Sequence, residues 1–205
     1  YLYDQELLEL KQISRKANYL LIPNGIYVDL KTETIPINAR VNKVIFCSRI
    51  HRRKRLDKFV QAAVELHKNF AQFEFEIFGN DDGDLSRCSK LIETLNASSY
   101  IRYKGALSSE AVLEKLAYVK LLMLPSDEEP FPMVILEALS VGTPVLVMPT
   151  CGLAKELKLI NSNFIVRNDS YVELAKSANL IISESENVDS TQIKKATLEI
   201  FGIGK

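Results

Sequence analysis

Short apolar runs alternate with amphipathic stretches along nearly the whole chain. The run at residues 44–47 is apolar at every position, as expected for a strand whose two faces are both covered by helices. Strands that alternate with helical patterns are typical of βαβ units and a parallel sheet. The alternation predicts strands at residues 44–47, 73–78, 100–103, 121–124, 144–148 and 164–166.

The amphipathic stretches follow the helical period of 3.6 residues. In the stretch that begins at Phe131, the apolar stripe leaves Glu137 to one side, where it can face a cleft. Gly142 and Pro144 end this helix before the next strand. We predict a doubly wound, Rossmann-like α/β domain with a six-stranded parallel sheet and helices on both faces. Its helices are expected at residues 56–68, 85–95, 109–118, 131–141, 153–159 and 171–183.

The two ends of the chain and one internal stretch depart from this alternation. The sequence begins with Tyr1 rather than Met and enters a helical pattern at residues 4–16, which we interpret as part of a longer polypeptide. Residues 31–42 contain two threonines, Pro36 and no periodicity, and are typical of a linker. The tail at residues 184–205 predicts one further helix, ended by glycines.

Composition and charge argue against several classes of protein. Lys plus Arg and Asp plus Glu number 26 each, so no overall field attracts the chain to nucleic acid or to an anionic membrane. Cys47, Cys88 and Cys151 form no CxxC pair, which favours idle thiols in a reducing cytosol over zinc or redox chemistry. No apolar run reaches the roughly 18 residues of a membrane span. We expect a soluble, cytoplasmic protein.

The loops after the strands are the candidate sites, because ligands of open α/β sheets bind beyond the carboxyl ends of the strands. Residues 48–55, after the first strand, carry five cationic side chains among eight. One explanation of such a run is a solvated surface. The other is an anion site, in which Arg49 offers a planar fork to phosphate oxygens and Lys54 a mobile charge.

Glu129 and Glu137 stand eight positions apart around the start of the helix predicted at residues 131–141. A helix N-terminus carries unpaired N–H groups and a partial positive charge, so it can receive a diphosphate. The two carboxylates can accept hydrogen bonds from sugar hydroxyls on either side of it. The alternative is that the acidic residues at 127–129 merely complement the helix dipole.

The remaining polar residues give weaker signals. Residues 79–84, after the second strand, contain two glycines that let the backbone approach a ligand closely. Their three aspartates lack the glycine and glutamate spacing of a calcium loop, so a plain turn is favoured. His51 and His67 are the only histidines, and no serine or cysteine has a convincing base partner. Neither a hydrolase triad nor a metal site is predicted.

Several short motifs follow one another in order along the chain. They are Pro23-Asn24-Gly25 with Asp29, Ser48-Arg49-Ile50 with Lys54, Phe78-Gly79, Pro125-Ser126, and Glu129 to Glu137 with Ala138, Gly142 and Pro144. This series resembles the C-terminal half of the retaining glycosyltransferases of family 4, which are group 1 enzymes with the GT-B fold. The resemblance runs roughly from residue 18 to residue 180, and an ordered series is far more specific than any one motif.

The resemblance implies a donor site for a nucleotide diphosphate sugar such as a UDP- or GDP-hexose. The implied catalytic residues are Arg49, Lys54 and Glu129. Arg49 and Lys54 would neutralise the diphosphate, and Glu129 would contact hydroxyls of the donor sugar. Glu137 would hold the ribose diol. Backbone groups near Gly79 and Ile101 would lie against the base, and the N–H groups of Met133 and Val134 would receive a phosphate. Phe131 and Pro132 are the other implied donor-binding residues.

The implied reaction is sugar transfer with retention, in which the leaving diphosphate is stabilised electrostatically without a cofactor or metal ion. The chain departs from the family pattern at three places. Arg55 and Pro132 stand where the family usually has glycine, and Gly152 belongs to an incomplete glycine pair, which leaves Glu156 without a clear counterpart. These departures concern donor preference more than the reaction class.

The resemblance also implies three segments and their partners. Residues 1–30 would end an N-terminal acceptor domain with its exit strand, residues 31–183 would bind the donor nucleotide, and residues 184–205 would return toward the first domain. The expected partners are that domain of the same polypeptide, a nucleotide sugar and a glycan or lipid-linked acceptor for cell-surface polysaccharide or glycolipid synthesis, with peripheral contact to the cytoplasmic membrane face and no nucleic acid. Alone, this chain is expected to bind nucleotide sugar weakly and to transfer nothing.

Two alternatives stay open. The first is a non-catalytic nucleotide- or phosphate-binding module on the same fold, although such a module would be expected to lose one of the four key charged residues. The second is a flavodoxin-like or receiver-like signalling domain. A receiver needs acidic residues at the end of its first strand, where this chain has Ser48 and Arg49.

Overall fold

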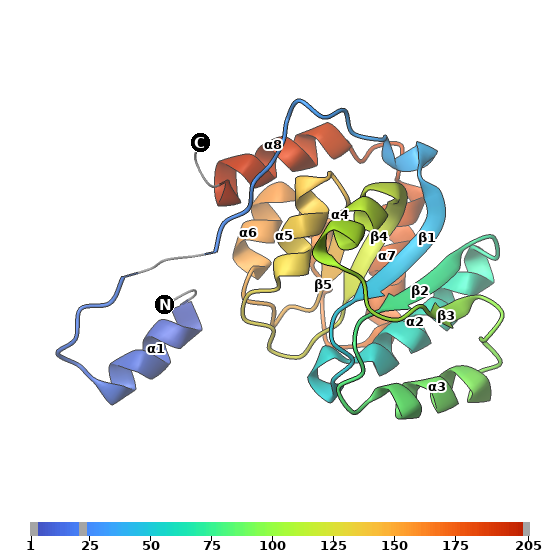
Figure 1. Cartoon of the computed structure of the whole chain (residues 1–205), viewed down its shortest axis with the longest axis horizontal. Helices are drawn as coiled ribbons and strands as arrows, with labels where there is room; N and C mark the ends of the chain where they lie inside the picture. Colours follow the sequence, from blue (N-terminus) through green and yellow to red (C-terminus); the bar gives the residue numbers. More distant parts are fainter. Residues whose placement is uncertain (1–3, 21–23, 203–205) are drawn as a thin grey trace.

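A five-stranded parallel sheet forms the centre of the computed structural model, which describes residues 4–20 and 24–202. The strands lie in the order β3-β2-β1-β4-β5 (Figure 1). Every neighbouring pair is parallel, which confirms the predicted α/β class. The strands are β1 (Val41–Cys47), β2 (Glu74–Phe78), β3 (Ile101–Tyr103), β4 (Val119–Leu124) and β5 (Val145–Val147).

Helices cover both faces of the sheet, as the sequence predicts (Figure 1). One layer contains α2 (Leu56–Asn69), which packs against α3 (Leu85–Thr94) and α7 (Tyr171–Ser183). In the other layer, α8 (Ser190–Phe201) packs against α5 (Met133–Ser140) and α6 (Ala154–Ile160), and α5 also contacts α4 (Ser109–Tyr118). Within the described ranges, no helix has both the length and the apolar character needed to cross a membrane.

The prediction of a sixth strand at residues 164–166 is wrong. Ser162–Phe164 form a 3-10 turn, η3, and Ile165 makes only a single bridge to Val147 of β5. Phe164 is nevertheless fully buried. The apolar run is therefore buried in the core without forming a strand. The neighbouring strand β5 has only three residues, so it offers few backbone groups for pairing.

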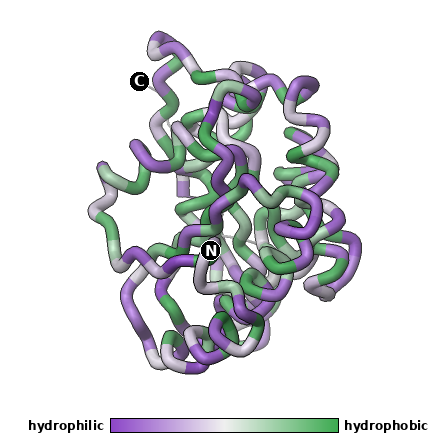
Figure 2. Tube along the Cα trace, turned by 90° about the vertical axis from the view of Figure 1, so that its right-hand side faces the viewer, coloured by the Kyte–Doolittle hydropathy of each residue, from purple (hydrophilic) through white to green (hydrophobic). Residues whose placement is uncertain are grey.

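The centre of the core lies between the sheet and α2. Val44, Ile45 and Phe46 of β1 are at most 1% exposed, and the ring of Phe46 lies 5.7 Å from the ring of Phe59 on α2. Burying a large apolar side chain of this kind contributes roughly 1.5 to 3 kcal/mol. Figure 2 shows hydrophobic and hydrophilic residues alternating along the helical parts of the trace, as burial of one helix face requires.

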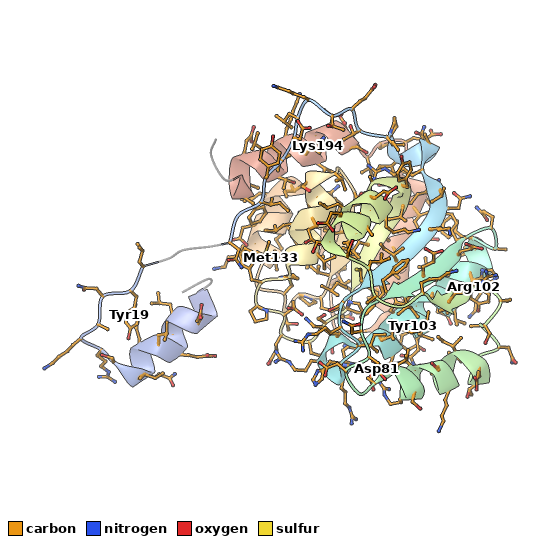
Figure 3. All side chains as sticks on the ribbon, in the orientation of Figure 1. Tyr19, Asp81, Arg102, Tyr103, Met133 and Lys194 are labelled. Atoms are coloured by element: carbon orange, nitrogen blue, oxygen red, sulfur yellow. The ribbon has the colours of Figure 1, made fainter. Side chains whose placement is uncertain are left out.

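The predicted linker at residues 31–42 has more structure than its sequence suggests. Its second half forms a short 3-10 helix, η1 (Ile37–Ala39), with Ile37 buried, and β1 begins at Val41. The further helix predicted in the tail is α8, which contacts this segment through Lys194 (Figure 3). The Lys194 ammonium donates a hydrogen bond of 3.0 Å to the carbonyl of Thr32.

Helix α1 (Asp4–Ile13) ends three residues earlier than predicted and lies apart from the sheet (Figure 1). The exit strand expected near its end falls partly on residues 21–23, which lie outside the described residues. Ile26 connects the following segment to the domain, because its amide donates a hydrogen bond of 3.0 Å to the carbonyl of Phe201 at the end of α8.

Candidate functional site

Three loops meet beyond the carboxyl ends of β1, β2 and β4. Ile50, after β1, forms a bridge with Asp81, after β2. The amide of Asp127, after β4, donates a hydrogen bond of 2.8 Å to the carbonyl of Arg53. These backbone contacts hold the loops at residues 48–55, 79–84 and 125–132 together, so that their side chains form one surface.

Lys54 and Glu129 lie at the centre of this surface. The Lys54 ammonium is in direct hydrogen-bonding contact with a carboxylate oxygen of Glu129. Both side chains are largely buried, with exposed fractions of 17% for Lys54 and 14% for Glu129. In a pair this well shielded from water, each charge needs a partner, because removing one residue leaves the other as an unpaired buried charge that lowers stability. A ligand that carries both phosphate and hydroxyl groups can supply a new partner to each.

Glu137 lies on α5 near the end of β1. Burial, together with the charge of Glu137, raises the pKa of the Cys47 thiol to about 11. The Glu137 carboxylate is half-buried and has no hydrogen bond or ion pair with the part of the chain that the structure describes. Burial raises the pKa of Glu137 above its ordinary value of 4.5. A half-buried carboxylate without a partner is a ready acceptor for the hydroxyls of a ligand.

We expect the variant Glu137→Gln to be more stable than the parent chain at neutral pH. Because its pKa is raised in the folded state, Glu137 costs stability when it ionises, and this cost develops as the pH rises from 4.5 through the folded-state pKa. Thermal unfolding at about pH 4 and about pH 7 measures the effect. The variant should show a higher Tm only at the higher pH, and an equal gain at both would contradict the assignment.

The N-terminus of α5 is open toward the same surface. Pro132 is its N-cap residue, and no side chain caps the helix. The amides of Met133 and Val134 make no hydrogen bond with other described residues, so they are available to an anion. The helix begins at Met133 rather than at residue 131, and its first turn contains no acidic residue. The acidic residues at 127–129 therefore do not act as first-turn partners of the helix dipole.

Arg49 does not join Lys54 and Glu129. Its Nη1 forms an ion pair of 2.9 Å with Asp82, and the Arg49 side chain is 71% exposed. An exposed pair of this kind contributes at most about 1 kcal/mol, so a phosphate can displace the carboxylate. Arg49 thus stands at the rim of the site, extended toward the loop after β2.

Gly79 marks the side of the site next to β2. Its backbone has φ +143°, and a Cβ at this position would lie 1.8 Å from the carbonyl oxygen of Ser48. Only glycine fits such a close approach of two loop backbones. The Gly79 amide donates a hydrogen bond of 2.9 Å to the carbonyl of Gly105, which follows β3.

Ile101 does not lie beside Gly79. It is the first residue of β3, pairs with Phe75 of β2 and is buried. The residue of β3 that reaches the site is Tyr103, whose hydroxyl donates a hydrogen bond of 2.9 Å to the carbonyl of Gly79. Figure 3 shows Tyr103 and Asp81 at this same end of the domain. Tyr103 contacts Gly79 because it ends β3, and the loops that can face a ligand lie beyond the carboxyl ends of parallel strands.

The loop after β5 supports the loop that carries Glu129. Glu128 has a left-handed backbone with φ 47°, and its amide donates a hydrogen bond of 3.4 Å to the hydroxyl of Thr150. The amide of Gly152 donates a hydrogen bond of 2.8 Å to the carbonyl of Glu129. A cavity of about 580 Å³ opens beside these residues, within the size range of small-molecule sites. It is lined by Glu9, Arg53, Glu128, Glu129, Pro130, Thr150 and Gly152.

Glu156 lies near the same residues. Burial, together with the charges of Glu129 and Glu156, raises the pKa of the Cys151 thiol to about 12. One carboxylate oxygen of Glu156 is buried without a hydrogen-bond partner among the described residues. Glu156 therefore belongs to the surroundings of the Glu129 loop, although the sequence left its place in the motif unclear.

Comparison with known proteins identifies the family. A family model described as glycosyl transferases group 1 matches residues 29–198. The chain belongs to the group 1 glycosyltransferases. The matched range contains the three loops and α5, so the site lies inside it.

A curated relative and two solved structures resemble this group 1 glycosyltransferase chain. The UDP-N-acetylglucosamine–peptide N-acetylglucosaminyltransferase GtfA subunit of Streptococcus pneumoniae serotype 4 is 27% identical over 153 residues, which are 75% of this chain and 27% of that protein. The sucrose-phosphate synthase of Thermosynechococcus elongatus has a TM-score of 0.81 at 20% identity, over 98% of this chain and 53% of that one. The pneumococcal O-GlcNAc transferase GtfA, in complex with UDP and GlcNAc, has a TM-score of 0.71 at 20% identity, over 98% of this chain and 42% of that one.

These likenesses agree with the expected GT-B type of fold. The chain spans only about a quarter of the curated relative and about half of each solved chain.

Arg55 is a departure from the group 1 glycosyltransferase pattern that the backbone explains. Its φ of 50° and ψ of 48° lie in the left-handed region that glycine adopts without strain, and glycine is what the motif leads one to expect. Arg55 compensates through its side chain. Its Nε forms an ion pair of 3.1 Å with Asp57, and its Nη1 one of 3.0 Å with Asp127.

We expect Arg55→Gly to change the free energy of unfolding little, and Arg55→Ala to lower it by about 1 to 2 kcal/mol. Glycine removes the left-handed strain of roughly 1 kcal/mol, which offsets the lost ion pairs. Alanine loses the ion pairs and keeps the strain. Urea unfolding of both variants checks this, and equal losses would show that the strain does not matter.

The surface formed by the three loops also contains residues that the sequence analysis did not single out. Their roles depend on contacts between loops that are far apart in the sequence, which periodicity does not show. Gly152 was noted only as part of an incomplete glycine pair, without the contact that it makes with Glu129. The others are Arg53, Asp82, Tyr103 and Thr150.

Proposed function

We propose that this chain binds a nucleotide diphosphate sugar and forms the donor half of a retaining glycosyltransferase. The observation that carries the proposal is the grouping of the Lys54–Glu129 pair with the open N-terminus of α5 and the unpartnered carboxylate of Glu137. Together they present a cation, free backbone amides and two carboxylates. These are the groups that a sugar, a diphosphate and a ribose require.

Each group has one role in this proposal. The amides of Met133 and Val134 receive a phosphate at the positive end of α5. Lys54 lies next to that phosphate and stabilises the charge that develops when the sugar leaves. Glu129 accepts hydrogen bonds from sugar hydroxyls, and Glu137 accepts them from the ribose diol. Arg49 supplies a second cation once it leaves Asp82, so the proposed chemistry needs no metal ion or cofactor.

The donor we favour is a UDP-sugar. GtfA, the curated relative, is named for UDP-N-acetylglucosamine, and GtfA was solved with UDP and GlcNAc. The acceptor, a glycan or a lipid-linked molecule, and a second domain to hold it are part of the same proposal. Backbone groups of Gly79 and the neighbouring Tyr103 would contact the base.

The test is a calorimetric titration of the chain with UDP, UDP-N-acetylglucosamine and GDP-mannose. Glu137→Ala should weaken UDP and its sugar alike by about one to two orders of magnitude, given about 1.5 to 3 kcal/mol for a charge-assisted hydrogen bond. Glu129→Ala should weaken only the UDP-sugar. Free UDP should keep or gain affinity in this variant, because Lys54 loses its competing partner.

Asp81→Ala is a matched control, since this carboxylate only accepts local hydrogen bonds from the amides of Gly83 and Leu85. Equal losses of free UDP affinity in Glu129→Ala and Glu137→Ala would refute the division of roles. An absence of nucleotide binding by the parent chain would refute the proposed function itself.

A further inference from the structure

A second cavity, of about 350 Å³, adjoins the Glu129 cavity. Among the residues that the structure describes, the two linings share only Arg53. The second one brings together η2 (Arg52–Lys54), the starts of α2 and α3, and the loop after β4. Its lining residues are Arg52, Arg53, Arg55, Asp57, Arg87 and Asp127.

Two of these arginines are held in place by carboxylates. Arg55 is fixed by its ion pairs with Asp57 and Asp127. Arg87 forms ion pairs of 2.7 Å with Asp84 and 3.6 Å with Asp57. Their guanidinium groups are therefore oriented in advance, and each can still donate to a further acceptor, because a guanidinium has five N–H donors.

The side chains of the other two arginines form no ion pair with a carboxylate of the described residues. The side chain of Arg52 is exposed and forms no hydrogen bond or ion pair with the described ranges. The side chain of Arg53 donates only to the backbone carbonyl of Glu128, at 3.1 Å. Four guanidinium groups and two carboxylates line the cavity, and Asp84 adds a third carboxylate through its ion pair with Arg87. Together these groups carry an excess of one positive charge in a chain whose net charge is zero.

We propose that this cavity binds the phosphate group of a second ligand, a phosphate monoester or diester distinct from the sugar donor. Planar guanidinium forks match phosphate oxygens in pairs, and a phosphate near neutral pH supplies up to two negative charges. The volume leaves room for the group to which the phosphate is attached. The site uses neither Lys54, Glu129 nor Glu137, so it does not depend on the proposed donor site.

The test follows the amide and arginine Nε signals of the isotope-labelled chain by NMR during titration with inorganic phosphate at constant ionic strength. The amides of Arg52, Arg53 and Asp57 and the Nε of Arg87 should shift together. Arg52→Gln should weaken this response about fivefold, as expected for one exposed charge contact. Arg102→Gln is the control, because Arg102 lies exposed on the edge strand β3 and donates only to the carbonyl of Ser99.

The donor site gives a separate signal, since phosphate at the start of α5 would shift Met133 and Val134. Shifts confined to those two amides, or a response that Arg52→Gln leaves unchanged, would overturn the proposal. Sedimentation with phosphatidylglycerol vesicles distinguishes the source of the phosphate. Vesicle binding that inorganic phosphate displaces and Arg52→Gln weakens identifies a lipid headgroup, whereas no vesicle binding alongside the NMR response identifies a soluble ester. Vesicle binding that phosphate does not displace would contradict the cavity as the site.

Discussion

Replacing Arg40 with methionine is expected to lower the free energy of unfolding by about 3 to 5 kcal/mol, because several buried hydrogen-bond acceptors would lose their donor. Arg40 is 4% exposed and has no carboxylate partner among the described residues. Carbonyl groups surround it instead. Its Nε donates to Ile35 at 2.9 Å, its Nη1 to Val119 at 3.3 Å, and its Nη2 to Val141 at 3.1 Å.

The position of Arg40 explains the size of this effect. The carbonyls that it binds include those at the ends of α4 and α5, where the helix dipoles are negative. Its guanidinium also donates to the hydroxyls of Thr143 and Ser190, and Ser190 begins α8. Methionine would leave these buried acceptors unsatisfied, at about 1 to 3 kcal/mol each before relaxation. The same residue therefore fixes the linker, two helix ends and α8.

Urea unfolding with circular dichroism measures the loss, and Arg102→Met provides an exposed control that should change stability by less than about 0.5 kcal/mol. Arg40→Lys should recover only part of the loss, since one ammonium cannot reach all the carbonyls that a guanidinium fork reaches. Burial lowers the pKa of Arg40 to about 10, so its charge is present at neutral pH. A stability change below about 1 kcal/mol in Arg40→Met would refute the structural role.

Local patterns in the sequence predicted most of the fold. The helices α4 and α7 have the predicted bounds, because their apolar stripes and their serine N-caps, Ser108 and Ser170, coincide. The prediction of a strand at residues 164–166 was wrong because an apolar run indicates only that its residues are buried. It does not show whether a neighbouring strand is available for pairing. The structural role of Arg40 was not predicted, for a different reason. All but one of the hydrogen-bond partners of its guanidinium group lie 76 to 150 positions away, beyond any local pattern.

The site shows the same division between local and distant information. Lys54 and Glu129 were identified from motifs, and the structure brings them into contact. The sequence could not show that Arg49 pairs with Asp82, or that Tyr103 rather than Ile101 reaches Gly79. Those facts depend on the register of β2 against β3 and on how two loops meet, which are three-dimensional properties.

The second large effect is expected from Gly152→Ala, which should lower the affinity for the donor at least about tenfold. Each factor of ten corresponds to about 1.4 kcal/mol of binding free energy. A Cβ at residue 152 would lie 1.9 Å from the carbonyl oxygen of Pro130 and 2.9 Å from its carbonyl carbon. These are backbone atoms, so no side-chain rotation relieves the clash. The loop at residues 128–130 must move, and it carries Glu129 away from Lys54.

Gly83→Ala separates this displacement from a simple loss of stability. Gly83 has φ +96°, and a Cβ there would meet nothing within 4 Å, so its substitution adds backbone strain of roughly 1 to 2 kcal/mol without a clash. Gly152→Ala should cost a similar amount, about 1 to 3 kcal/mol for overpacking. Both variants should therefore unfold more easily, but only Gly152→Ala should lose UDP-sugar affinity in calorimetric titration. If the two variants bound the donor equally well, the Gly152–Pro130 contact would have no part in positioning Glu129, and the carboxylate would have to be held by Lys54 alone.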